Sequence, residues 1–331
     1  MDEEIGRLLA GAPALDEDAA AAVRTRAENV LRPAGALARL DEVATWLAAC
    51  QRTAHPAVES PGVIVFVGDH GVTERAVSAY PAEVTRAMLK ALQEGVATAS
   101  VLSRAIGATL DVVDVGVGDP TNDFVDGPAL DPARFRECFE RGRQAVADAR
   151  CDLLVFGEMG IGNTTAASAV TAALLGIPAE RCTGRGTGVD DEGLETKRRV
   201  VAAASARVAG SPPIEILRQV GGTELVAIAG ATLEARLRSI PVVLDGFVVC
   251  ASVAPLHAVD GRALEHSVAG HRSPEPGHAL LLDWMGKRPL LDLELRLGEA
   301  SGALAAVPLI KLAAAAVTEV ATFQEWGVEG R

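Results

Sequence analysis

The sequence predicts an α/β fold in which a mainly parallel sheet is covered by helices on both faces. Short runs rich in β-branched residues, such as 63–67 and 110–115, alternate with longer stretches of helical spacing. Glycine-containing loops follow several of these runs, as they do at the ligand-binding edge of parallel sheets. The chain of 331 residues is long enough to form one elaborate domain, or one main domain with a small addition.

Local patterns predict the individual elements in order. Residues 16–51 show leucine, valine and alanine at helical spacing and are expected to form two helices joined at 32–35. A linker-like stretch, 56–62, precedes the alternating part of the chain. Strands are then expected at 63–67, 110–115, 153–156 and 241–244. Helices are expected at 81–106, 132–149, 166–175, from Asp190 onward, at 223–238 and at 302–326.

Composition and charge exclude several classes of protein. The net charge of −13, with no Lys/Arg cluster interleaved with aromatic residues, argues against a nucleic-acid-binding protein. Five widely spaced cysteines without a C-x-x-C motif fit reduced thiols in a cytoplasmic protein. The histidines show no metal-ligand spacing, so no metal site is expected. The acidic N-terminus does not resemble a signal peptide, and Pro308 and Lys311 interrupt the apolar run 303–317, so no membrane span is expected.

The segment Gly157–Thr165 is the most informative part of the chain. It joins a strand-like run to an Ala-rich helix through glycines and the polar residues Asn163, Thr164 and Thr165, which could cap that helix. Exposed amides and a positive helix end favour an anion there, and Glu158 places an acid beside it. The alternative is an ordinary strand–helix turn that needs small residues.

A second candidate for anion binding is Gly184–Gly188, in which alternating glycines precede a helix that carries Lys197. The alternative is a flexible connection with a solvated lysine. Neither segment has the P-loop or the dinucleotide-binding pattern, so triphosphate hydrolysis and NAD chemistry are poorly supported.

Three further segments carry polar residues. In 296–302, Glu299 lies between glycines and is either a helix-terminal charge or a general base in an apolar pocket. In 271–278, Ser273 could hold a phosphate, or the segment could simply start a helix at Pro276. In 221–224, we expect Thr223 to cap its own helix.

The carboxyl ends of parallel strands meet at one edge of a sheet, where ligands bind. The loops that follow the predicted strands are therefore expected to form one composite crevice. These loops are 68–71, 116–118, 157–165 and 245–246.

Taken together and in this order, these segments resemble the nicotinate-nucleotide:dimethylbenzimidazole phosphoribosyltransferases of cobalamin lower-ligand synthesis. The likeness covers nearly the whole chain. The matching segments are 32–40, 68–72, 77–85, 157–165, 184–197, 220–222, 244–247, 271–278, 296–302 and 321–323.

The resemblance implies a Rossmann-like catalytic domain, 56–302, and a small helical domain built from 1–55 with 303–331. It also implies a homodimer with small-molecule substrates and no cofactor. In the implied reaction, nicotinate mononucleotide donates ribose 5-phosphate to a nitrogen of a benzimidazole-type base. Inversion at the anomeric carbon gives α-ribazole 5′-phosphate and nicotinate.

The resemblance also implies a role for individual residues. Glu299 corresponds to the general base that removes the azole proton, and Glu158 to a second acid in the site. The phosphate and ribose are held in the family at positions matched here by Gly160, Asn163, Thr164, Gly186, Lys197 and Ser273. The base pocket is matched by Tyr80, Met88 and Leu297.

One region departs from the family pattern. After Gly116–Gly118, relatives carry a Gly-Thr loop and an Ala-Met-Ser/Thr segment, whereas this chain has a shortened stretch, 119–131. Two alternatives remain beside the interpretation as a dimethylbenzimidazole phosphoribosyltransferase. One is a related transferase with a different azole, purine or phenolic acceptor. The other is a non-catalytic protein that binds a nucleotide or a benzimidazole.

Overall fold

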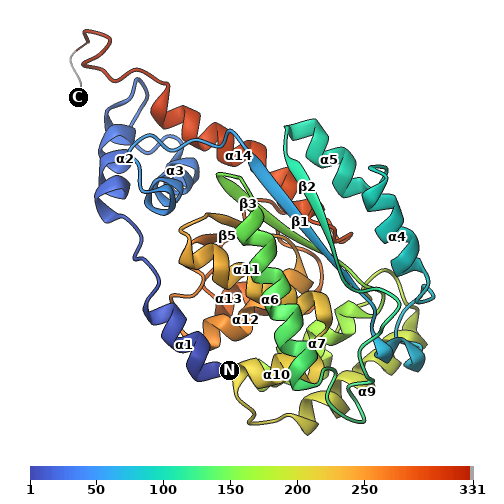
Figure 1. Cartoon of the computed structure of the whole chain (residues 1–331). Coiled ribbons are helices and arrows are strands. Elements are labelled where there is room, and N and C mark those ends of the chain that lie inside the picture. The colour runs from blue at the N-terminus through green and yellow to red at the C-terminus, as the bar shows by residue number, and fades with distance from the viewer. Residues whose placement is uncertain (329–331) are drawn as a thin grey trace.

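The computed structural model describes residues 1–328 and contains a five-stranded sheet with the order β2-β1-β3-β4-β5, in which all neighbouring strands are parallel (Figure 1). The predicted α/β fold with a mainly parallel sheet is therefore confirmed. Residues 329–331, which end the predicted helical-domain segment 303–331, lie outside the described part of the chain. The strands are β1 (Pro61–Gly68), β2 (Thr109–Gly116), β3 (Leu153–Met159), β4 (Val242–Leu244) and β5 (Ser267–Ala269).

Alternate side chains of the strands enter two separate hydrophobic cores. Ile64 and Phe66 of β1 and Phe156 of β3 belong to one core, whereas Val65 of β1 and Val155 of β3 belong to the other. Successive side chains of a strand point to opposite faces, so a strand covered on both sides must be apolar throughout. All 8 residues of β1 are buried accordingly.

One face of the sheet is covered by a layer of helices that includes α6 and α11 (Figure 1). These two helices approach each other closely through glycines. A side chain at Gly142 of α6 would collide with the backbone carbonyl of Ala227, and one at Gly230 of α11 would collide with that of Phe139. The helices of this layer are α6 (Pro132–Asp148), α7 (Asn163–Leu175), α10 (Pro213–Val220), α11 (Thr223–Leu237) and α12 (Phe247–Val259).

The other face is covered by helices from both ends of the chain and from the segment between β1 and β2 (Figure 1). These are α2 (Glu17–Asn29), α3 (Ala38–Gln51), α4 (Val84–Gln93), α5 (Thr98–Ile106) and α14 (Ser301–Thr318). The remaining elements are α1 (Asp2–Ala10), η1 (Gly71–Arg75), α8 (Ala179–Cys182), α9 (Asp191–Arg207) and α13 (Pro276–Trp284).

The two ends of the chain are joined by direct contacts. The guanidinium of Arg26 donates to the carbonyl oxygens of Val317 and Val320, and Val30 pairs with Thr322 in an isolated antiparallel bridge. Helix α14 packs against α3 and α2, whereas α1 packs against α10, α11 and α12. The division into a catalytic domain and a small helical domain stays a prediction.

Helix α14 is the one helix within residues 1–328 that is long and apolar enough to cross a membrane by length and composition. More than half of it, 56%, is buried inside the protein. It packs against α3, α5 and β3, so its apolar side chains fill the core of this face.

The structure corrects two predicted helices. The helix expected at 81–106 is two helices, α4 and α5, separated by a turn in which Gly95 adopts a positive φ of +78°. Glycine takes this left-handed conformation readily, and a residue in this conformation commonly ends a helix. The helix expected at 302–326 ends at Thr318.

The structure also corrects two predicted helix caps. Gly222, and not Thr223, is the N-cap of α11, and the hydroxyl of Thr223 is buried beside Gly68 and Gly116. Gly162 is the N-cap of α7, and the side chain of Asn163, which was expected to serve as a cap, donates instead to Glu158.

Candidate active site

A cavity of about 720 Å³ lies at the carboxyl end of β3 and is open to solvent on one side. The segments 159–164, 246–248 and 294–299 line it, together with residues that precede α9 and α13. The crevice predicted at the ends of the strands is therefore present after β3 and β4. The loops 68–71 and 116–118 are not among its lining residues, so the prediction is wrong for the ends of β1 and β2.

Glu299 lies in the wall of this cavity on a strained stretch of backbone. It is only 3% exposed, and both Glu299 and Ala300 adopt positive φ angles, of 55° and 63°. Their backbone lies flat against β3, where a side chain at Gly157 would collide with Ala300. Strained non-glycine conformations of this kind cost free energy and cluster at functional sites.

The environment of Glu299 makes its carboxyl group more basic than usual. Burial raises its pKa above the ordinary value, the nearby charge of Asp245 acts in the same direction, and a weak hydrogen bond from the backbone amide of Ala99 acts against both. That amide lies 3.5 Å from Oε2. A more basic carboxylate is a better proton acceptor at neutral pH.

Glu158 lies in the same wall, at the end of β3. Its Oε2 accepts a hydrogen bond from the side-chain amide of Asn163, and its backbone carbonyl accepts one from the amide of Glu299. Burial raises the pKa of Glu158 well above its usual range, and the charges of Asp245 and Glu224 raise it further. This environment favours the protonated acid more than the surroundings of an exposed glutamate do.

A cradle for an anion forms where the turn before α7 meets the turn before α9. The ammonium group of Lys197, which is 1% exposed, donates to Oγ1 of Thr164 at 2.9 Å. A Cβ at Gly186 would lie 2.8 Å from that hydroxyl and 3.1 Å from Nζ of Lys197. Burial lowers the pKa of Lys197 to about 8, against the effect of Glu275. A bound anion would satisfy this buried charge.

Ser273 lines the same cavity from a third segment. Its backbone amide donates to Nδ1 of His278 at 3.0 Å, and its hydroxyl lies 3.0 Å from the same nitrogen. Burial lowers the pKa of His278 to about 3, so the imidazole is neutral and holds Ser273 as an acceptor. The carboxylate of Glu275 accepts a hydrogen bond of 2.9 Å from the backbone amide of Gly186. This bond links the segment before α13 to the segment before α9.

Part of the cavity lining is apolar. Tyr80 and Leu297 are 50% and 52% exposed, and Met88, which is partly buried, packs against the core. An exposed aromatic and an exposed leucine at the rim of one cavity offer surface for a flat aromatic ligand.

The structure thus brings together every residue predicted for the site, and all of them line this one cavity. Their individual roles stay predictions. These residues are Glu158, Glu299, Gly160, Asn163, Thr164, Gly186, Lys197, Ser273, Tyr80, Met88 and Leu297. In residues 1–328, no group of three or more His, Cys, Asp or Glu side chains is placed to hold a metal ion.

Sequence reasoning missed other polar residues of the wall. Arg185, Arg296 and His271 line the cavity. Nε2 of His271 lies 3.5 Å from Oδ1 of Asp245. The same carboxylate oxygen accepts a hydrogen bond of 2.8 Å from the backbone amide of Ala303. Local sequence offers no signal for these contacts, because Asp245 follows β4 and His271 follows β5.

The shortened segment 119–131 contributes no lining residue to this cavity within the described chain. It packs beneath the end of β1, where the amide of Thr121 donates to the carbonyl of Asp69 and its hydroxyl accepts from the amide of Gly71. The departure from the family pattern therefore falls outside the cavity wall.

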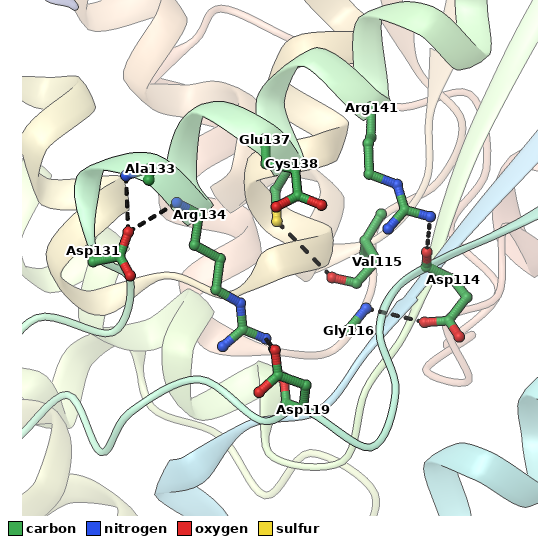
Figure 2. A pocket seen from close by; sticks show the side chains of 10 residues that line it. All are labelled: Asp114, Val115, Gly116, Asp119, Asp131, Ala133, Arg134, Glu137, Cys138 and Arg141. Atoms are coloured by element: carbon green, nitrogen blue, oxygen red, sulfur yellow. Dashed lines mark hydrogen bonds and ion pairs between the residues drawn. The ribbon is translucent and has the colours of Figure 1, made fainter.

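A second cleft, of about 530 Å³, opens between the end of β2 and the start of α6 (Figure 2). Its arginines bind the main chain: Arg134 donates to the carbonyl of Asp119, and Arg141 donates to that of Asp114 (Figure 2). Arg134 also donates to the carbonyl of Pro120. These guanidinium groups fasten β2 and the loop after it to α6, which is a structural role.

The fold and the cavity define a class of protein: an α/β protein with a ligand-sized cavity, lined by a buried lysine and buried carboxyl groups, at the carboxyl end of a parallel sheet. Residues 12–328 match the model of a family described as phosphoribosyltransferase. The chain belongs to this phosphoribosyltransferase family.

Several relatives and a solved structure carry the enzyme name nicotinate-nucleotide–dimethylbenzimidazole phosphoribosyltransferase. The chain is 48% identical to the protein of that name from Ruegeria pomeroyi, over 97% of this chain and 95% of the relative. It is 46% identical to the one from Methylocella silvestris, over 99% and 97%. A crystal structure of the enzyme from Thermus thermophilus is similar, with a TM-score of 0.91 and 41% identity, over 96% of this chain and 100% of that chain.

Proposed function

We propose that this protein transfers ribose 5-phosphate from nicotinate mononucleotide to 5,6-dimethylbenzimidazole. The products are α-ribazole 5′-phosphate and nicotinate, and the reaction belongs to the assembly of the cobalamin nucleotide loop. The names of the relatives support this proposal, and so does the composition of the cavity, which is lined by a buried lysine, two buried acids and several apolar side chains.

The anion cradle suits the phosphate of the donor. Lys197 supplies a buried positive charge, Thr164 and Ser273 supply hydroxyl groups, and the turn at Gly160 brings backbone close to the ligand. Holding two substrates in line can lower a barrier by about 7–11 kcal/mol, because the encounter becomes effectively unimolecular.

The acceptor would lie against Tyr80, Met88 and Leu297, with its N–H directed toward Glu299. One azole nitrogen attacks the anomeric carbon as the bond to the pyridinium nitrogen breaks, and that bonding pair leaves with nicotinate. The proton of the other azole nitrogen passes to the carboxylate of Glu299. Pyridinium is already a good leaving group, so the step needs neither a metal nor a covalent nucleophile.

The observation that carries the proposal is a buried, basic carboxylate, Glu299, in the same cavity as the buried cation Lys197. The test is to incubate the purified protein with nicotinate mononucleotide and 5,6-dimethylbenzimidazole and to identify the products by mass. We expect α-ribazole 5′-phosphate and free nicotinate in equal amounts.

A panel of acceptors in the same assay tests the identity of the base. If another azole, a purine or a phenol gives product and dimethylbenzimidazole does not, the acceptor is that other compound. Tight binding of both substrates without release of nicotinate would show a binding protein and overturn the enzymatic proposal.

We propose further that the protein is a cytoplasmic homodimer. The cysteines support the cytoplasmic location, because Cys50, Cys138, Cys151, Cys182 and Cys250 are all free.

Exposed hydrophobic side chains support the dimer. Val96, Val101 and Leu312 are exposed large hydrophobic residues on or beside α5 and α14, which pack against each other. Sedimentation should give a mass of about twice 34.2 kDa. Val101→Asp or Leu312→Asp should shift this mass toward that of the monomer.

A further inference from the structure

A buried histidine–carboxylate pair lies directly behind the anion-binding wall of the cavity. Nε2 of His70, in the loop after β1, lies 2.5 Å from Oε1 of Glu224, in the first turn of α11. Both side chains are fully buried, and neither lines the cavity. The mechanism described above does not use them.

Glycines from three separate segments enclose this pair. A Cβ at Gly160, in the cavity wall, would lie 2.9 Å from Oε1 of Glu224 and 3.2 Å from Cδ2 of His70. A side chain at Gly222 would collide with the imidazole, and one at Gly68 would lie 3.2 Å from the carboxylate. The backbone of the Gly160 turn therefore rests on the pair without intervening side-chain atoms.

The pair also supports the rest of the turn. The carbonyl of His70 accepts hydrogen bonds from the hydroxyl of Thr73 at 2.7 Å and from its amide at 3.3 Å. Thr73 and Cβ of His70 would lie 3.0 and 3.4 Å from a Cβ at Gly162. Gly160 and Gly162 are thus backed by one segment that the pair anchors.

Stability alone does not account for this arrangement. Desolvation of an acid and an imidazole is costly, and replacing a buried ion pair by apolar residues is often neutral or stabilising. Within residues 1–328, Nδ1 of His70 and Oε2 of Glu224 have no hydrogen-bond partner, which adds to the cost.

We propose that His70 and Glu224 are positioning residues that hold the Gly160 turn in place for the ribose phosphate. The inference rests on the proposed function, because it takes the ligand of that turn to be the nucleotide donor. The pair also bears on the acid at the end of β3, because the charge of Glu224 adds to the effects of burial and of Asp245 that raise the pKa of Glu158.

The test replaces Glu224 in two ways. Glu224→Leu removes both charge and hydrogen bond, whereas Glu224→Gln keeps an acceptor for Nε2 of His70. We expect Glu224→Leu to raise the KM and Kd for nicotinate mononucleotide by about tenfold or more, with the KM for the base unchanged, because the backbone of the Gly160 turn loses the pair on which it rests. Glu224→Gln should recover most of the loss.

The matched control is Glu234→Leu on the same helix. Glu234 is also buried and pairs with Arg143 and Arg238, but it lies outside the cavity wall. We expect this variant to lose thermal stability while both KM values stay within twofold of the parent.

Equal nucleotide binding by the parent and Glu224→Leu would overturn the inference. So would a fall in kcat with both KM values unchanged, the sign of a smaller folded fraction. If Glu224→Leu fails to fold, His70→Gln is measured in its place. This variant keeps a donor toward Glu224, and its KM and Kd for nicotinate mononucleotide are compared with those of Glu224→Gln by the same criteria. Calorimetry with nicotinate mononucleotide alone separates the two proposals: failure of the parent to bind it contradicts the proposed function itself.

Discussion

The backbone amide of Glu299 donates a hydrogen bond of 3.2 Å to the backbone carbonyl of Glu158. The bond joins the loop before α14 to the end of β3, although the two residues are far apart in the sequence. The backbones that carry the two carboxyl groups are therefore tied to each other. A substitution that moves one backbone is expected to affect both acids.

Glu299→Gln should lower turnover by at least about 100-fold, because general base catalysis is typically worth 10²–10⁴. The amide keeps the shape of the side chain but cannot accept the azole proton. Steady-state release of nicotinate measures the effect, and circular dichroism checks the fold. Glu94→Gln removes an exposed carboxylate that does not line the cavity, and it serves as the control. Turnover of Glu299→Gln close to that of the control would remove Glu299 from the mechanism.

The pH dependence of kcat/KM should show an acidic limb set by Glu299. Burial raises the pKa of this carboxyl group above the usual 4.5, and the base must be deprotonated to act. Activity should therefore fall as pH decreases through a midpoint higher than that of an ordinary glutamate. A profile that is flat down to pH 4.5, or an acidic limb that persists unchanged in Glu299→Gln, would contradict the assignment.

Glu158→Gln should stabilise the protein at neutral pH. Folding raises the pKa of Glu158 above the usual 4.5, so the ionised side chain disfavours the folded state increasingly as pH rises past that value. Glutamine keeps an acceptor for Asn163 and avoids the buried charge. We expect Tm to rise by about 1–2 °C, the shift that about 1 kcal/mol produces in a chain of this length. The gain should shrink toward pH 4. A lower Tm at pH 7 would show that the carboxylate is stabilised in the fold.

The sequence identified the strands and the site segments because local chemistry marks them. The runs of β1, β2 and β3 are apolar or β-branched, and glycine with polar residues follows the strand that carries Glu158. Parallel strands place such ends at one edge, so a one-dimensional pattern sufficed to predict a shared cavity.

What the sequence did not reveal depends on contacts between distant segments. His70 and Glu224 are 154 residues apart, and their pairing depends on glycines that leave room in three different loops. For the same reason Thr223 was mistaken for a helix cap: a Gly-Gly-Thr sequence fits a cap as well as a buried close approach. The break at Gly95 was missed because the apolar spacing continues across it.

Affinity for nicotinate mononucleotide should weaken as pH rises through about 8. Burial lowers the pKa of Lys197 to about 8, and loss of its proton removes the positive charge of the cradle. KM for the nucleotide should rise above this pH, while KM for the uncharged base stays level. Lys197→Met should raise KM at all pH values and abolish the dependence. Lys90→Met, at an exposed lysine of α4, is the control. An alkaline rise in KM that persists in Lys197→Met would assign it to another group.

Gly298→Ala should impair both activity and stability, because Gly298 meets two constraints at once. Its φ is +86°, a conformation that side chains rarely adopt, and a Cβ there would lie 2.5 Å from Oε1 of Glu158. The methyl group would push Glu158 and the Glu299 backbone out of register. We expect a loss of at least tenfold in kcat and a stability loss of about 1–3 kcal/mol, measured by urea unfolding.

Gly127→Ala provides the comparison, since within the described chain a Cβ at Gly127 would meet open space. This variant should keep both activity and stability, so a general effect of replacing glycine by alanine is separated from the effect at the site. If Gly298→Ala kept full turnover with unchanged unfolding, the contact between Gly298 and Glu158 would not constrain the two acids. The relative position of Glu158 and Glu299 would then have to depend on the hydrogen bond between their backbones alone.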